Sequence, residues 1–367
     1  MNNTVLTLQN ESFSLKRFPA NTFDKSLRAW DAADEYIINH VCEHVDLSTV
    51  EHIAIANDGF GALSCAMARL APQATITVFT DSYMSELAIA QNLTACNLDK
   101  NNVSVKSALN IDCLQGTKVD LVLLKVPRTL SYLAHLLLGL NQVTHSDTLI
   151  ISGAMIKLVT SSAIKTFDKY LLNTKTSLAK KKARLIFSEQ KPCDVNEFIE
   201  FPINEVSDDS LDFTLHNYAN VFCREQVDIG ARYMLNALPK LRKQDAVVID
   251  LGCGNGILGT SMLGQYPSAN VVFVDESYMG IASAQRTLEQ SGANSSNAQF
   301  LIAHCLQDYP PNSADVVICN PPFHQQNTVI DDIAWQMFLD AKRVLRPGGE
   351  LRIVGNRHLD HRVKLSK

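Results

Sequence analysis

The sequence contains an internal repeat. When the 367-residue chain is aligned with itself at an offset of 195 residues, two copies match without a gap over about 75 residues. The matched positions include Ser82-Tyr83-Met84 with Ser277-Tyr278-Met279, Gly59 with Gly254, Gly61 with Gly256, Asp120 with Asp315, and Pro127 with Pro322. A shared ungapped frame of this length indicates duplication of a whole domain.

Each copy alternates short β-rich runs with helical stretches. In the second copy the expected strands lie at 247–249, 271–274, 300–302, 316–318 and 351–354. Continuous apolar strands between helices are typical of a parallel sheet that helices cover on both faces. We therefore predict two tandem Rossmann-like α/β domains, residues 1–200 and 201–367, with a boundary between Phe187 and Leu211.

The two copies differ after their fifth expected strand. In the first copy about 34 residues follow Gly153, including strand-like runs at 174–178 and 183–187, whereas 12 residues follow the matching Gly355. A hairpin closes the first sheet in this prediction. The second domain is expected to lack these C-terminal strands, which leaves a sheet edge unpaired and puts the activity of this chain in question.

Composition excludes several classes of protein. Hydrophobic residues make up 46% and charged residues 19%, as in soluble globular domains, and a net charge of -5 argues against non-specific nucleic-acid binding. The longest apolar run, near residues 130–140, is about half a membrane span. No CxxC pair occurs among the nine cysteines, and we assign no metal site to the ten histidines. We expect a reduced cytoplasmic monomer without a membrane segment, disulfide framework or metal.

A glycine-rich loop follows the first strand of the second copy. It reads Asp250-Leu-Gly-Cys-Gly-Asn-Gly256, and it also fits the G-x-G-x-x-G dinucleotide pattern with Asp275 further along. Glycines let a ligand approach the backbone, and the following helix presents N–H groups. The loop alone suits either NAD or S-adenosylmethionine.

Two acidic residues at strand ends favour the second cofactor. A carboxylate at Asp250 can reach the amino group of a methionine moiety, whereas it would repel a pyrophosphate. Asp275 suits a ribose diol in either case. Strand ends are where α/β sheets bind ligands. The alternative is that both acids cap helices and form turns.

The motif Asn320-Pro321-Pro322-Phe323 follows the fourth expected strand. The exocyclic amine of a base is a poor nucleophile, because its lone pair is delocalised into the ring. The Asn320 side-chain oxygen and the Pro321 carbonyl can accept its two hydrogens, and Phe323 can stack on the base. The three residues predict a methyl-transfer site for a base amine; the alternative is a simple turn.

These motifs resemble those of S-adenosylmethionine-dependent ribosomal RNA guanine-N2 methyltransferases, which carry a duplicated methyltransferase fold. The chain looks more like the branch that acts on 23S RNA than the 16S branch. The similarity extends to stretches outside the shared motifs: LKRFPANTFDKSLRAWDAADEYI (15–37), NDGFGALSC (57–65), KKARLI (181–186), HNYANVFCREQVDIGAR (216–232), NPPFHQQ (320–326) and AWQMF (334–338).

The resemblance implies roles for individual residues. It places Asp250, Gly252, Gly254 and Gly256 at the methionine end of the cofactor and Asp275 at the ribose. His304 stands near the adenine, where the family usually has asparagine. Phe222 would pack over the cofactor, with ordinary core packing as the alternative. Asn320 and Phe323 would hold the guanine, with His324 beside the substrate.

The first copy has lost these chemical residues. At the same offset Asp250 corresponds to Ile55, Asp275 to Thr80 and the NPPF motif to Lys125-Val-Pro-Arg128. We expect a fold without a cofactor pocket. Lys125 and Arg128, with Lys181 and Arg184 from a basic cluster, are candidates for RNA phosphate contacts; the alternative is a structural role.

The sequence therefore favours transfer of a methyl group to N2 of a guanine in 23S RNA, with protein-free RNA as the expected substrate. A 16S RNA substrate is one alternative. A nicotinamide-dependent oxidoreductase built on the glycine loop is another, though it gives the NPPF motif no role. A non-catalytic RNA-binding protein is the third, if the second domain lacks a competent cofactor site.

Overall fold

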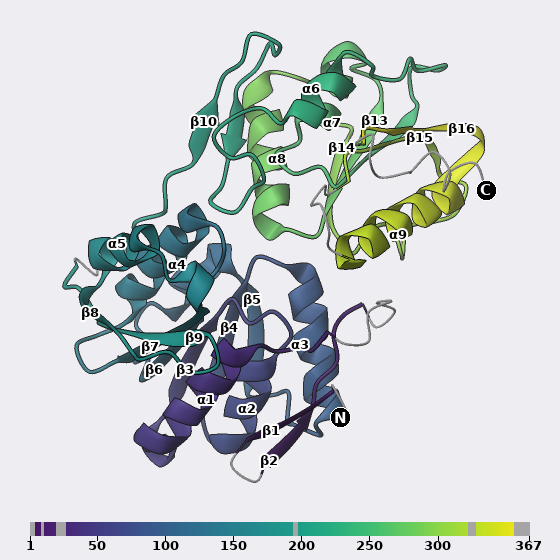
Figure 1. Ribbon diagram of the computed structural model, residues 1–367. Helices are drawn as coiled ribbons and strands as arrows, with labels where there is room; N and C mark the ends of the chain where they lie inside the picture. Colours follow the sequence, from purple (N-terminus) through teal and green to yellow (C-terminus); the bar gives the residue numbers. More distant parts are fainter. Residues whose placement is uncertain (1–3, 9–10, 20–26, 194–196, 322–327, 356–367) are drawn as a thin grey trace. The chain divides into compact units, whose positions relative to one another are not determined.

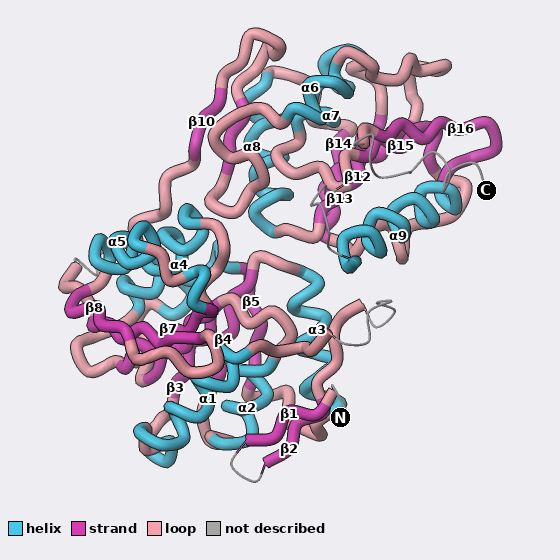
Figure 2. The backbone as a smooth tube through the Cα atoms, viewed as in Figure 1, coloured by secondary structure: helices cyan, strands magenta, loops and turns pink. Residues whose placement is uncertain are grey.

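The computed structural model describes residues 4–8, 11–19, 27–193, 197–321 and 328–355. The chain divides into two compact units, the first ending at Phe201 and the second beginning at Pro202 (Figure 1). Both are layered α/β structures in which helices flank a central sheet (Figure 2). In the described segments, no helix combines the length and the apolar character needed to cross a bilayer.

Unit 1 contains a seven-stranded sheet in the order β5-β4-β3-β6-β7-β9-β8. All neighbours are parallel except β9, which runs antiparallel to β7 and β8. The strands are β3 His52–Ala56, β4 Thr75–Thr80, β5 Val103–Ser107, β6 Leu121–Lys125, β7 Leu149–Met155, β8 Leu172–Thr176 and β9 Ala183–Glu189, and a separate hairpin joins β1 Val5–Leu8 to β2 Glu11–Ser14. The helices are α1 Ala32–His44, α2 Ala62–Leu70, α3 Tyr83–Ala95, α4 Leu130–Val143 and α5 Ser161–Tyr170.

Unit 2 contains a five-stranded parallel sheet in the order β14-β13-β12-β15-β16. The strands are β12 Val247–Leu251, β13 Asn270–Asp275, β14 Ala298–Ile302, β15 Ala314–Cys319 and β16 Leu345–Ile353. The helices are α6 Ile229–Leu235, α7 Ile257–Gln265, α8 Tyr278–Ser291 and α9 Thr328–Val344, and β10 Asn204–Val206 pairs with β11 Leu215–Asn217.

Helices cover both faces of the unit 2 sheet, as the continuous apolar strands predict. Val248 and Phe273 face α7 and α8 in one buried cluster, whereas Ile249 and Val272 face α9 in another. Figure 1 shows α9 on the opposite side of the sheet from α7 and α8. The expected strands are confirmed, although the last of them, β16, begins at Leu345, earlier than the expected residue 351. Residues 356–367 lie outside the described segments.

The two sheets share one register. His52 lies opposite Thr75 in unit 1, and Val247 lies opposite Asn270 in unit 2, which is the same pair shifted by 195. The same shift relates the pairs between the first and fourth strands and between the second and third. Because register fixes which side chains reach the carboxyl edge of a sheet, equivalent strand ends lie at equivalent places.

Candidate functional site

The glycine loop of unit 2 connects β12 to α7 at the carboxyl edge of the sheet. Gly252, Gly254 and Gly256 have φ of 74°, 51° and 77°, a left-handed region that residues with a Cβ rarely adopt. A Cβ on Gly254 would meet no atom within 4 Å, whereas one on Gly256 would lie 2.8 Å from Ala284. The loop thus packs tightly against α8 at one end and is open to a ligand at the other.

Three successive N–H groups of this loop are already used within the protein. Gly252 and Cys253 donate to the Val274 carbonyl at 2.8 and 3.0 Å, and Gly254 donates to Asp275 Oδ2 at 2.8 Å. A pyrophosphate cradle needs such N–H groups directed at the phosphate. The arrangement therefore counts against a dinucleotide at this loop.

Asp250 lies at the end of β12 and is 1% exposed. Its Oδ2 accepts a hydrogen bond from the Gly259 amide at 2.8 Å, which ties the strand end to the first turn of α7. Burial raises the pKa of this carboxyl to about 7, with the nearby Asp275 charge adding to the shift. A buried carboxylate of raised pKa is stabilised by a cationic ligand group, such as an amine.

Asp275 ends β13 and holds the loop in place. Besides accepting from Gly254, it accepts at Oδ1 from the Ser277 amide at 2.9 Å, while Ser277 caps α8. Burial raises its pKa, against which these backbone hydrogen bonds act. The turn and loop contacts expected as the alternative reading are therefore present, and the ribose role stays a prediction.

Asn320 and Pro321 directly follow β15, at the same edge of the sheet. The Asn320 amide nitrogen donates to Asp228 Oδ2 at 2.9 Å. Its Oδ1 is buried and finds no hydrogen-bond partner within the described part of the chain. Pro322, Phe323 and His324, which complete the motif, lie outside the described segments, so their predicted contacts stay predictions.

Asp228 also belongs to this site, although the sequence motifs did not identify it as a site residue. It is the N-cap of α6, where its Oδ2 also accepts from the Ala231 amide at 2.9 Å. The sequence signal was present, because an Asp before a short apolar stretch is typical of a helix start. Nothing in the sequence says that this cap meets a residue 92 positions later.

His304 follows β14 and is buried, with 8% of its surface exposed. Its Nδ1 lies 3.8 Å from the Cys305 sulfur. Burial lowers the pKa of the imidazole, although the Asp340 carboxylate acts in the opposite direction. The neutral ring keeps one donor and one acceptor, so it can replace an asparagine in a hydrogen bond.

Phe222 is 62% exposed and does not belong to the core. The core alternative considered for it is therefore wrong. It lies seven positions before α6, whose Ile229 and Tyr233 are also exposed on one helix face. An exposed aromatic ring in this segment is compatible with a ligand contact, and its place over the cofactor stays a prediction.

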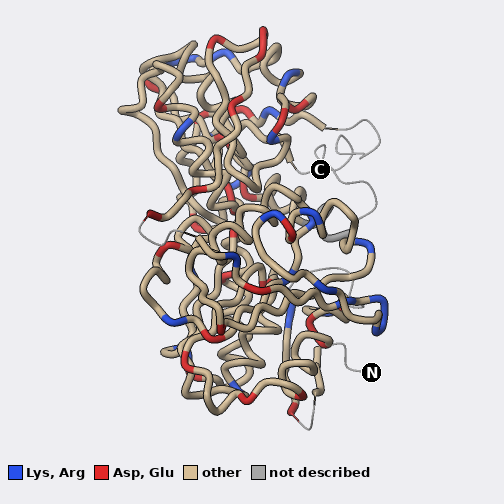
Figure 3. The backbone as a smooth tube through the Cα atoms, turned by 90° about the vertical axis from the view of Figure 1, so that its left-hand side faces the viewer, with Lys and Arg blue, Asp and Glu red and all other residues tan. Residues whose placement is uncertain are grey.

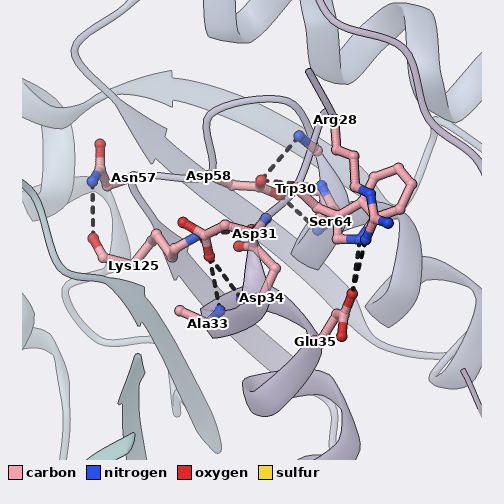
Figure 4. A network of polar contacts seen from close by, with 12 residues as sticks. Arg28, Trp30, Asp31, Ala33, Asp34, Glu35, Asn57, Asp58, Ser64 and Lys125 are labelled. Carbon is pink, nitrogen blue, oxygen red and sulfur yellow. Dashed lines mark hydrogen bonds and ion pairs between the residues drawn. The ribbon is translucent and has the colours of Figure 1, made fainter. Parts of the chain in front are cut away.

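Unit 1 fills the equivalent strand ends with its own side chains (Figure 4). The Lys125 Nζ lies 2.9 Å from Asp31 Oδ1 and 2.6 Å from Asp34 Oδ2, both at the start of α1. The Asn57 amide donates to the Lys125 carbonyl at 2.9 Å. Asp58 accepts from the amides of residues 61, 62 and 64 at the start of α2.

The charges in this cluster compensate one another. Burial raises the pKa of Asp34 to about 6, with the Lys125 charge opposing the shift. Burial alone would lower the pKa of Lys125, but the two carboxylates outweigh it and raise that pKa. Lys125 also overcomes the effect of burial at Asp31, whose pKa is lowered. An internal ion-pair network therefore lies at this strand end of unit 1.

The four predicted phosphate contacts of unit 1 differ in accessibility. Lys125 is directed at the two carboxylates, and this arrangement does not favour a phosphate contact. Arg184 is half-buried, whereas Arg128 and Lys181 are exposed. Lys181 pairs with Glu35 at 2.7 Å from a side chain that is 77% exposed. Figure 3 shows that basic and acidic residues are interspersed along most of the backbone.

Comparison with known proteins extends over both units. Residues 3–192 match the family described as RLMG N-terminal domain, and residues 212–367 match the Methyltransferase small domain. The ribosomal RNA large subunit methyltransferase G of Pseudoalteromonas translucida (strain TAC 125) is 44% identical over 98% of this chain and 92% of that protein. The protein of the same name from Yersinia pestis (strain Pestoides F) is 42% identical over 99% and 89%.

The chain belongs to the ribosomal RNA large subunit methyltransferase G family. A solved structure, the Thermus thermophilus 16S rRNA N2 G1207 methyltransferase (RsmC) in complex with AdoMet and guanosine, is similar in fold, with a TM-score of 0.73 at 20% identity. It covers 99% of this chain, which covers 92% of it. The α/β methyltransferase fold with a Rossmann-like sheet is thereby confirmed. Among the described residues, no group of three potential ligands could hold a metal ion.

Proposed function

We propose that this protein transfers a methyl group from S-adenosylmethionine to the exocyclic N2 of a guanine in 23S ribosomal RNA. Family membership supports the reaction class, and the names of the relatives support a large-subunit RNA over the 16S alternative. The occupied N–H groups of the glycine loop leave the oxidoreductase alternative without support.

One observation carries the chemistry: the buried, unpaired Oδ1 of Asn320. A buried acceptor without a partner costs free energy, which a donor from a ligand would recover. The guanine amine has two N–H groups. Accepting them at Asn320 Oδ1 and the Pro321 carbonyl withdraws the lone pair from the ring and directs it toward the methyl donor. Positioning and lone-pair release are the protein's contributions, and no general base is proposed, because the methylated amine is cationic after the transfer and can lose its extra proton to water.

The residues at the glycine loop fit the cofactor. Bound S-adenosylmethionine supplies an electrophilic methyl group and a neutral thioether as the leaving group. Asp250 would accept from its amino group, because that ammonium compensates a buried carboxylate. Asp275 would accept from the ribose hydroxyls, and His304 would hold the adenine. The open side of Gly254 allows this approach.

The two units have different parts in this proposal. We infer that they descend from one duplicated domain, which the common register supports. Residues 201–367 form the catalytic domain. Residues 1–200 form a methyltransferase-like domain without a cofactor site, whose exposed Arg128 and Lys181 contact RNA phosphates.

The substrate is proposed to be protein-free 23S RNA, and the active species a monomer, since one chain carries all the site residues named above. The nine cysteines are free thiols. We place the reaction in the cytoplasm, where ribosomal RNA is transcribed and thiols stay reduced.

The test is transfer of a radiolabelled methyl group from S-adenosylmethionine to deproteinised 23S RNA that lacks the modification, followed by separation of the nucleosides. Label in N2-methylguanosine is the expected result. Label in another nucleoside would contradict the choice of atom. Failure to bind S-adenosylmethionine at all would leave the non-catalytic RNA-binding alternative, whereas label only with assembled subunits would overturn the protein-free substrate.

A further inference from the structure

We infer that Asp228 is a positioning residue that sets the orientation of the Asn320 amide. The inference rests on the proposed function, because it concerns the group that would accept hydrogen bonds from the guanine amine. Asp228 touches neither cofactor nor base in this account. It acts through Asn320, which it contacts from another element of unit 2.

The contact joins two rigid parts of the unit. Asn320 follows β15, an interior strand of the described sheet, and Asp228 is the N-cap of α6. The distance from the Asn320 amide nitrogen to Asp228 Oδ2 is 2.9 Å, and the same oxygen accepts from the Ala231 amide at 2.9 Å. The carboxylate is therefore held by the helix before it meets the asparagine.

The chemistry of the pair determines whether the NH₂ group or the oxygen of the Asn320 amide faces Asp228. An ionised carboxylate only accepts hydrogen bonds, so the end of Asn320 that faces it must be the NH₂ group. The oxygen must then face away, and that oxygen is the buried atom without a partner. In the flipped orientation, the Asn320 oxygen and the Asp228 carboxylate, which are both acceptors, would face each other. The NH₂ group of Asn320 would then face the guanine amine and could not accept its N–H groups.

The backbone at Gly230 allows this close approach. A Cβ there would lie 2.9 Å from Asp228 Oδ2 and 3.0 Å from Asn320 Oδ1. The first distance is shorter than real Cβ atoms show, and the second is tighter than most real Cβ contacts, so a side chain at this position would press on both members of the pair. The glycine keeps α6 against the end of β15.

Unit 1 contains the same contact with a different donor. Asp31, the N-cap of α1, lies 2.9 Å from Lys125, which occupies the position equivalent to Asn320. The contact between cap and strand end is thus a property of both units. An ammonium group has three equivalent donors and no orientation to set, whereas an amide has two different ends. Only unit 2 can use the contact to direct an acceptor.

The experiment compares Asp228→Ser and Asp228→Asn with the matched cap variant Asp31→Ser in the full-length protein. Serine caps a helix about as well as aspartate, so the fold is retained, but its hydroxyl is shorter and both donates and accepts. For Asp228→Ser we expect kcat for methyl transfer to fall by about 10–100-fold, as positioning errors near a reacting atom do. KM and Kd for S-adenosylmethionine should stay within about 2-fold of the wild type. This is well below the roughly tenfold change in Kd that corresponds to 1.4 kcal/mol of binding free energy.

Asp228→Asn should keep an intermediate kcat, because its amide oxygen can still accept from Asn320 while its NH₂ group permits the flipped form. Asp31→Ser should leave kcat unchanged. Wild-type kcat in Asp228→Ser would overturn the inference. So would a loss of kcat that is matched by equal losses of cofactor affinity and melting temperature, since that is a folding effect. Absence of guanine-N2 transfer by the wild type would instead refute the proposed function.

Discussion

The strand ends of the two units occupy equivalent positions in their sheets, but their polar side chains have different partners. In unit 1, Lys125 and Asp34 meet in an ion-pair network that fills the carboxyl edge of the sheet. In unit 2 the same edge carries glycines with left-handed backbone, a buried carboxyl with a raised pKa and an amide oxygen without a partner. In the proposed function, the unpaired amide oxygen and the buried carboxyl of unit 2 are the groups that a ligand would stabilise.

The comparison separates what the fold needs from what the reaction needs. Asp120 accepts from the His52 amide in unit 1, and Asp315 accepts from the Val247 amide in unit 2, at 3.0 and 2.8 Å. This contact is the same in both units because it joins neighbouring strands. By contrast, the residues at the equivalent loop positions, Asn57 in unit 1 and Gly252 in unit 2, differ. The contact between neighbouring strands is shared, whereas the buried Asn320 Oδ1, which lacks a hydrogen-bond partner among the described residues, lies at the proposed site of unit 2.

The largest effect is expected from Asn320→Ala. Removing a polar group that is complementary to the transition state costs about 10²–10³ in turnover, so methyl transfer should fall to near the detection limit. Cofactor affinity should be retained, because this residue lies after β15 and not in the glycine loop. The measurement is initial rate together with calorimetric binding of S-adenosylmethionine. Substantial turnover by this variant would contradict the proposed role of the amide.

The matching change in unit 1, Lys125→Met, should affect stability instead of chemistry. It leaves two carboxylates without their buried counter-charge, which costs about 3 kcal/mol. Urea unfolding followed by fluorescence of Trp30 in a Trp335→Phe background reports on unit 1. Catalysis per folded molecule should be unchanged. An unaltered unfolding midpoint would show that the network does not stabilise unit 1.

A smaller effect is expected from Asp250→Asn, which removes the proposed charge-assisted hydrogen bond to the cofactor amine. Such a bond contributes about 1.5–3 kcal/mol, or roughly 10–100-fold in Kd. Burial raises the pKa of Asp250 from 3.8 to about 7, so the ligand-free fold loses stability progressively as the pH rises from about 4 to about 7.

The same shift gives a pH dependence of binding. Wild-type affinity for S-adenosylmethionine should strengthen as the pH rises from 6 to 8, because ionisation of Asp250 creates the partner of the ammonium group. The variant should lose that dependence. Asp58→Asn, at the corresponding loop of unit 1, should bind like the wild type. Equal pH profiles for wild type and Asp250→Asn would exclude a direct contact with the amine.

The smallest effect is expected from Arg128→Glu. One exposed phosphate contact should change RNA affinity by about 3–10-fold at low salt and less at high salt. Lys100→Glu makes the same charge change at an exposed residue before β5, near the opposite edge of the sheet, and should not affect binding. Filter binding at two salt concentrations measures both. Equal losses in both variants would indicate a general charge effect rather than a contact by Arg128.

The sheet of each unit could be predicted from sequence, because apolar strands and the 195-residue frame are local or periodic signals. The position of the glycine loop and of Asn320 followed for the same reason: both directly succeed predicted strands. The family resemblance supplied the reaction.

The side-chain contacts could not be predicted in this way. Lys125 meets carboxylates that lie about 90 residues earlier, and Asp228 meets Asn320 across a similar separation. Both contacts depend on where a short helix begins relative to a strand end, which hydrophobic periodicity does not encode. The prediction that Lys125 contacts phosphate did not take its ion pairs into account, because the sequence does not show which carboxylates lie beside a lysine.

The most direct test of the difference between the units is the stoichiometry of S-adenosylmethionine binding, measured by calorimetry on the full-length protein. One site per chain is expected, weakened by Asp250→Asn and unaffected by Asp58→Asn. Two sites per chain, or a single site that survives the change at Asp250 and is lost with the change at Asp58, would contradict the assignment of the cofactor to unit 2.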